Sequence, residues 1–123
     1  MLGYVTLGTN DMARGAKFYD EVLATIGGTR GMEADTFIAW TNGNPQQCML
    51  ALIKPHNGEA ATPGNGTMAA IAVDSREKVD VLHAKALELG AKDEGAVGER
   101  GSTFYAGYFR DLDGNKLNVF FMG

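Results

Sequence analysis

The spacing of hydrophobic residues changes from strand-like to helix-like twice along the chain. In the first stretch, the short β-branched segment 4–8 is followed by apolar residues three and four positions apart, at Met12, Ala16, Tyr19, Leu23 and Ile26. This pattern predicts a strand followed by an amphipathic helix. Asn10 or Thr9 is expected to cap the start of the helix, and Gly27-Gly28 to end it.

The second stretch repeats this order 64 residues later when Tyr4 is matched to Met68. Residues 68–73 predict a strand, and one apolar helical face follows at Val79, Leu82, Ala86 and Leu89. Asp74 and Glu77 have the spacing of a capping box at the helix start. The chain is therefore expected to contain two modules of the same design.

Strand-like segments follow each predicted helix. They occupy residues 29–34, 36–40 and 47–53 in the first half and residues 102–110 and 116–121 in the second. The Gly-rich segment 93–101 is expected to form turns and a flexible lid, and the position of any strand near it is left open. Each module then has the order βαβββ.

The predicted fold is α+β and forms a single domain over residues 1–123. Module one covers about 1–54, a linker rich in Pro, Gly and Ala covers about 55–66, and module two covers about 67–123. Joining the two open sheets side by side would give one curved mixed sheet, with the helices outside and a concave face within. A concave face is the expected place for a ligand.

Composition and charge exclude several classes of function. The chain has 123 residues, of which 45% are hydrophobic and 21% charged, as expected for one globular domain. A net charge of −4 and the absence of a Lys/Arg run argue against a nucleic-acid partner. No segment has the pattern of a signal peptide or a membrane span, so we expect a cytoplasmic protein with no membrane partner.

Cys48 is expected to be a buried structural thiol, and His83 on the second helix to be solvated.

Three segments carry a resemblance to a known family. Residues 4–11, followed by residues 18–23, resemble the opening of vicinal-oxygen-chelate proteins, and residues 110–117 resemble the end of their second module. Leu112 stands where a Pro is frequent in that last motif. The chain is thus similar to this superfamily of glyoxalase, bleomycin-resistance and dioxygenase-like proteins over essentially its whole length. The resemblance implies paired βαβββ modules and a homodimer.

The metal-dependent members of that superfamily hold a divalent ion through one side chain on the first strand and one on the last strand of each module, usually His, Glu or Gln. The resemblance aligns these positions with Tyr4, Met68 and Asn118, and residues 48–53 offer only Cys48 as a fourth donor. Phenol, thioether and neutral amide groups are poor ligands for hard or borderline ions. We therefore expect no metal site and no cofactor.

The same positions are expected to line a ligand pocket. Tyr4, Met68 and Asn118 either contact a ligand there or fill the interior of the sheet. Trp40 and Tyr108 are aromatic residues that can stack on a flat molecule, although aromatics on strands are more often core. Period-two alternation places Tyr108 and Tyr105 on opposite faces of their strand, and Tyr108 is preferred. Arg100, on the predicted lid, is a candidate clamp for a carboxylate or phosphate.

The predicted function is metal-independent binding of a small organic molecule in the concave pocket, as in bleomycin-resistance-like proteins. A glyoxalase-like lyase or isomerase that uses a divalent metal through atypical ligands is the alternative, so whether the chain is an enzyme stays open. A third possibility is an interaction module that uses the curved sheet for dimerisation and binds no ligand.

Overall fold

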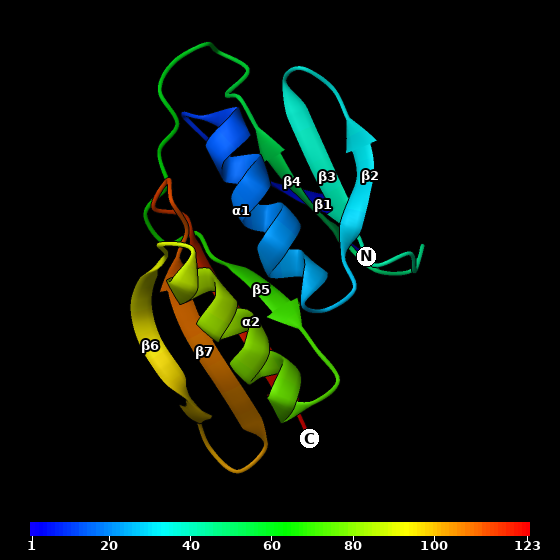
Figure 1. The fold of residues 1–123 in the computed structure, drawn as a ribbon, viewed down its shortest axis with the longest axis vertical. Helices are drawn as coiled ribbons and strands as arrows, with labels where there is room; N and C mark the ends of the chain where they lie inside the picture. Colours follow the sequence, from blue (N-terminus) through cyan, green and yellow to red (C-terminus); the bar gives the residue numbers. More distant parts are fainter.

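The computed structural model describes residues 1–123, which fold into two successive βαβββ modules (Figure 1). Module one contains β1 (Tyr4–Gly8), α1 (Met12–Ala24), β2 (Thr29–Glu33), β3 (Phe37–Thr41) and β4 (Met49–Ile53). Module two contains β5 (Ala69–Ala72), α2 (Arg76–Glu88), β6 (Lys92–Glu99), β7 (Phe104–Arg110) and β8 (Lys116–Met122). The predicted fold class is confirmed.

The internal repeat is also confirmed. Both helices have 13 residues, and α2 begins and ends 64 residues after α1. The predicted caps were wrong by one position in α2, and by one or two positions in α1, where Asn10 or Thr9 was expected. The Asp11 side chain accepts from the backbone N–H of Arg14, and the Ser75 side chain accepts from that of Lys78. The Thr9 hydroxyl is instead hydrogen-bonded to Asp113, which lies in the other module.

The strands form two four-stranded mixed sheets, with the orders β1-β4-β3-β2 and β5-β8-β7-β6. In each sheet the first strand of the module pairs in parallel with the last, and the other pairings are antiparallel. The expected single curved sheet is therefore divided in this chain. β1 and β5 are both edge strands.

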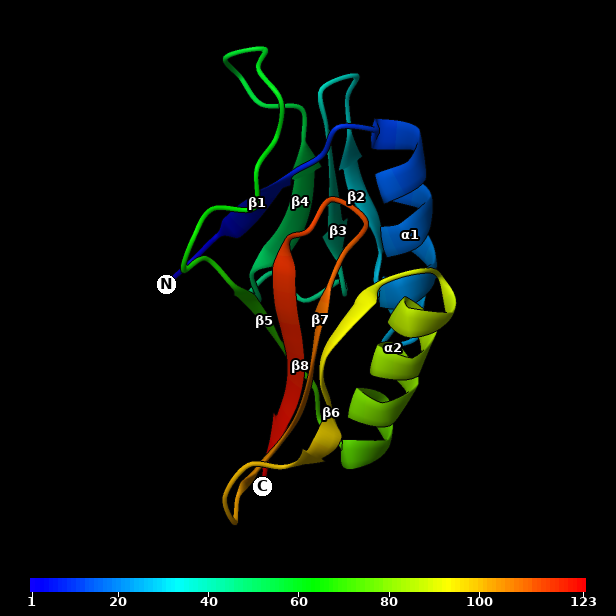
Figure 2. The same cartoon turned by 90° about the vertical axis from the view of Figure 1, so that its left-hand side faces the viewer.

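Both helices cover the same side of the two sheets, and the opposite side is left open (Figure 2). One hydrophobic core lies between the helices and the sheets and includes residues of both modules. Val22 and Leu52 from module one are fully buried in it, as are Val79, Leu82 and Phe109 from module two. The modules thus share a core, and each sheet keeps one uncovered face.

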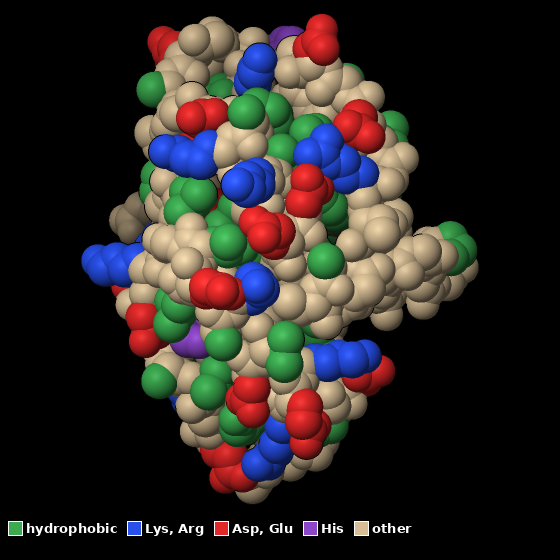
Figure 3. Space-filling view, in the orientation of Figure 1, with side chains coloured by type: hydrophobic (Ala, Val, Ile, Leu, Met, Phe, Trp, Pro, Cys, Tyr) green, Lys and Arg blue, Asp and Glu red, His purple; other side chains and the backbone are tan.

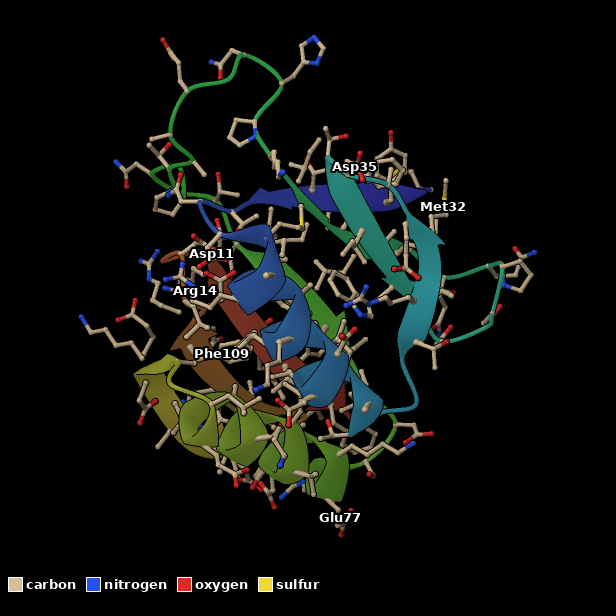
Figure 4. All side chains as sticks on the ribbon, turned by 45° about the horizontal axis from the view of Figure 1, so that its top comes forward. Asp11, Arg14, Met32, Asp35, Glu77 and Phe109 are labelled. Carbon is tan, nitrogen blue, oxygen red and sulfur yellow. The ribbon has the colours of Figure 1, made fainter.

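A polar contact joins the two modules at the turn between β7 and β8. The Asp113 carboxylate accepts hydrogen bonds from the Thr9 hydroxyl at 2.6 Å, the Asn10 backbone N–H at 2.9 Å and the Arg14 guanidinium at 3.0 Å. Figure 4 shows Asp11 and Arg14 at the start of α1, next to this turn. The Tyr19 hydroxyl donates to Asp111 at 2.5 Å, deeper in the same junction.

Three predictions about individual segments were wrong. The predicted lid is instead β6, an edge strand with two irregularities in its pairing to β7. Cys48 is exposed because it lies just before β4, outside the sheet. His83 is buried because α2 turns it toward β7, where it lies 3.1 Å from the Tyr108 carbonyl oxygen and 3.4 Å from the Asp93 carboxylate.

The helix-bearing surface mixes acidic and basic side chains without a large region of one sign (Figure 3). None of the helices is long and apolar enough to cross a membrane.

Candidate binding site on the second sheet

The open face of the second sheet is defined by the alternation of residues along β7 and β8. Tyr105 donates from its hydroxyl to Asp80 on α2, and Gly107 lies against the ring of His83. Tyr108 therefore points to the opposite, uncovered face, as the period-two pattern predicted. On β8 the same alternation buries Leu117 and Val119 in the core and turns Asn118 to the open face.

Four side chains with free bonding capacity gather there, and we call them the Tyr108 cluster: Arg100, Tyr108, Lys116 and Asn118. Tyr108 and Asn118 are direct cross-strand neighbours. The Arg100 guanidinium carbon lies 5.6 Å from the centre of the Tyr108 ring, and the Lys116 ammonium lies 5.8 Å from it. Both distances are those of cation–π contacts. Two cations therefore border one half-buried aromatic ring.

The side-chain oxygen of Asn118 is the one buried polar side-chain atom without a hydrogen-bond partner. Asn118 is 2% exposed, although it lies on the open face of the sheet. A buried acceptor left unpaired costs about 1–3 kcal/mol, and native structures rarely keep one without a reason. The Tyr108 hydroxyl also has no partner within the protein. The cluster therefore holds donors with free bonding capacity and a buried acceptor that no group of the protein satisfies.

A polar cavity of about 800 Å³ adjoins the cluster. It is lined by Lys116 and Arg110 from the sheet and by residues Thr62 to Met68 from the segment between β4 and β5. Arg110 donates to the Glu94 carboxylate at 2.7 Å, and this hydrogen bond holds the pKa of Glu94 below its usual range. Arg110 is thus neutralised within the protein, whereas Arg100 and Lys116 form no ion pair.

An apolar groove of about 550 Å³ lies where β5 meets module one. Val5 and Leu50 line it from one module and Ala69 and Ile71 from the other, and Met68 borders both this groove and the polar cavity. Met68 is 43% exposed. The polar cavity and the apolar groove therefore meet at the start of β5.

Only three of the six predicted site residues lie together in the structure. Arg100, Tyr108 and Asn118 come together, and Met68 lies at the edge of the neighbouring cavity. Tyr4 lies on the first sheet and is 63% exposed, so it is not part of the cluster. Trp40 borders the apolar groove, but only 2% of it is exposed, because it packs on Tyr19. Its indole N–H donates to Asp20 at 2.9 Å, which gives Trp40 a core role.

Sequence reasoning missed Lys116. It lies two residues before Asn118 on β8, so the period-two rule places both on one face. Only the cross-strand register, which pairs Tyr108 with Asn118, showed that Lys116 also lies near Tyr108.

The side chains at the superfamily's metal positions do not fit a divalent ion. Tyr4 and Met68 belong to different sheet edges, and Asn118 offers a single neutral oxygen. No group of three or more His, Cys, Asp or Glu side chains converges anywhere in the chain. The donors in place are better suited to hydrogen bonding and stacking than to holding a metal.

Comparison with known proteins gives a consistent family. Residues 1–119 match the family model described as the Glyoxalase/Bleomycin resistance protein/Dioxygenase superfamily. The crystal structure of a glyoxalase/bleomycin resistance protein from Albidiferax ferrireducens T118 has 32% identity and a TM-score of 0.92, and the match covers 100% of this chain and 99% of that one. No curated protein matches the chain significantly.

Two more distant structures share the fold. A glyoxalase/bleomycin resistance protein/dioxygenase family enzyme from Burkholderia phytofirmans PsJN has 21% identity and a TM-score of 0.77, with 98% of each chain covered. A lactoylglutathione lyase from Agrobacterium tumefaciens has 21% identity and a TM-score of 0.71, with 98% of this chain and 92% of that one covered. At these identities the likeness concerns the fold alone.

Proposed function

Because this chain belongs to the glyoxalase/bleomycin resistance protein/dioxygenase superfamily, we propose that it binds a small organic molecule at the Tyr108 cluster without using a metal. The observation that carries this proposal is the buried Asn118 oxygen, which has no partner although it faces the open side of the sheet. A ligand with a hydroxyl or N–H group would supply the missing donor.

The surroundings of Asn118 support the same function. The Tyr108 ring offers an aromatic surface on which a flat ligand can stack, and its hydroxyl is free to hydrogen-bond. The adjoining cavity of about 800 Å³ is within the usual range for small-molecule sites. The metal-independent part of the proposal is supported by the Tyr, Met and Asn side chains at the superfamily's metal positions.

A fragment screen followed by NMR chemical shifts tests the binding proposal. We expect soluble aromatic fragments to shift the backbone amide signals of Tyr108 and Asn118, and Asn118→Ala to weaken their binding with little change in melting temperature. Asn118→Ala removes an unpaired buried oxygen, which offsets the packing that is lost, so a large loss of stability with unchanged binding would assign Asn118 to the core instead.

Elemental analysis of protein purified without chelator tests the metal-independent part. Melting temperatures with added nickel, zinc, manganese or iron(II) complete the test, because an ion that binds the folded state raises the melting temperature. Stoichiometric metal or a strong upward shift would favour the alternative, a glyoxalase-like lyase or isomerase with atypical ligands. No metal and no shift supports a binding pocket.

We also propose that the chain forms a homodimer, as proteins of this superfamily often do. β1 and β5 each leave one edge without a paired strand. Tyr4 and Met68 are large, exposed side chains at the starts of these edges. Unpaired edges with apolar side chains favour pairing with another chain.

A further inference from the structure

We propose that the ligand of the Tyr108 cluster is an organic acid, with its carboxylate bound by Lys116 and Arg100 and a hydroxyl or N–H group directed at Asn118. This inference rests on the proposed binding function and adds the chemical class of the ligand.

The charges of the cluster support an anion. Arg100 donates to the backbone carbonyl oxygens of Gly98 at 2.9 Å and Ala96 at 2.7 Å, and no carboxylate of the chain pairs with it. These two bonds fix the guanidinium beside Tyr108 without neutralising it. Lys116 likewise forms no salt bridge. Two cations without a salt bridge thus border one side chain in a protein whose net charge is −4, and the charge of Lys116 also acts on the Glu94 carboxylate.

Arg110, a third cation of the same sheet, has an acidic partner. Arg110 lies on the same face of β7 as Tyr108 and is closely paired with Glu94. One cation of this face is therefore paired within the protein, whereas Arg100 and Lys116 are not. A charged group held in place and left unpaired is ready to form a charge-assisted hydrogen bond with a ligand.

Asn118 defines a second feature of the ligand. Its buried oxygen is an acceptor and has no lone pair engaged within the protein. A simple inorganic anion that carries no donor would leave this oxygen unpaired. An organic acid with a neighbouring hydroxyl or amino group satisfies both the cations and the amide, while its apolar part lies on the Tyr108 ring.

The test is an NMR titration with three probes: mandelate, which has a carboxylate, a hydroxyl and an aromatic ring; mandelamide, its neutral counterpart; and inorganic sulfate, an anion without a donor. We expect mandelate to shift the amide signals of Arg100, Tyr108 and Asn118 at lower concentration than mandelamide. Lys116→Gln and Arg100→Gln should each raise the Kd for mandelate about tenfold, since each removes a charged hydrogen bond. Lys17→Gln, which removes an exposed cation of α1, should leave the Kd unchanged.

The other outcomes overturn the inference in distinguishable ways. Equal binding of mandelate and mandelamide would keep the small-molecule site and refute its preference for anions. Binding of sulfate without mandelate would indicate an inorganic anion site and refute the organic-acid inference. If none of the three probes shifts these signals while neutral fragments do, the organic-acid inference fails and the proposed function stands; if neutral fragments fail as well, both fail.

Discussion

At the scale of single residues, the buried hydrogen bond between Tyr19 and Asp111 links α1 to the end of β7. Tyr19 is 1% exposed, and its hydroxyl donates to the Asp111 carboxylate at 2.5 Å. Burial, and next the charge of Asp111, raise the pKa of Tyr19 well above its ordinary value of 10.0. Asp111 also accepts from the backbone N–H groups of Asp113 and Asn115. Tyr19 therefore supplies one of the hydrogen bonds that satisfy the buried Asp111 carboxylate.

Tyr19→Phe is expected to lower the free energy of unfolding by about 1–3 kcal/mol, because the buried carboxylate loses a donor that water cannot replace. Urea denaturation at neutral pH measures this. The difference from the wild type should shrink as the pH rises above 10, because in the wild type the unfolded state ionises there while the folded state keeps its proton.

Tyr105→Phe is the matched control for this change. Tyr105 also donates to a carboxylate, that of Asp80, but at an exposed site where water can take the place of the lost partner. We expect a change within about 0.5 kcal/mol. Equal losses for the two variants would show that burial of Asp111 does not decide the effect.

Local sequence signals predicted the residue directions that depend on alternation alone. The opposite orientations of Tyr105 and Tyr108 followed from period two, and both helices followed from the spacing of their apolar residues. The environments of His83 and Lys116 could not be predicted this way, because each depends on which strand lies beside it. His83 is buried only because Gly107 leaves room for its ring on β7.

At the scale of elements, the edge strands of the two sheets have outer backbone N–H and C=O groups with no strand paired to them. The repeat predicted the starts of β1, α1, β5 and α2 to within two residues. It could not predict whether β1 and β5 pair with each other, because their pairing depends on how the modules pack. The Gly-rich β6 was mistaken for a lid because Gly is common in loops, and its irregular pairing to β7 accommodates it.

Tyr4→Lys is expected to convert a dimer into a monomer or to weaken it strongly, since a lysine at an exposed strand edge opposes pairing with another chain. Light scattering over a range of protein concentrations measures the change in mass. Met32→Lys is the matched control, because Met32 is 50% exposed on β2, the opposite edge of the same sheet (Figure 4). A wild type that stays monomeric, or a Met32 variant that alone dissociates, would contradict dimerisation through β1.

At the scale of the whole molecule, two kinds of contact hold the modules together. One is the shared core, in which the rings of Phe18 on α1 and Phe109 on β7 lie 6.5 Å apart. The other is the polar junction around Asp113, whose side chain is 3% exposed. The sequence motif at residues 110–117 indicated the turn but not its partner, because the contact joins residues about 100 positions apart.

Asp113→Ala tests how much of the coupling between the modules comes from the polar junction and how much from the shared core. The change removes the acceptor of the Thr9 hydroxyl, which is buried, and the partner of Arg14, so we expect a loss of about 2–3 kcal/mol in the free energy of unfolding. Urea denaturation can be followed by the fluorescence of Trp40, which reports on module one, and by far-ultraviolet circular dichroism, which reports on both modules. At one fixed protein concentration the two transitions should shift together, because the core still couples the modules.

Asp35→Ala, which removes an exposed carboxylate without an ion pair, should shift neither (Figure 4). If the Trp40 transition separates from the dichroism transition, the Asp113 junction, and not the core, makes the two modules unfold as one.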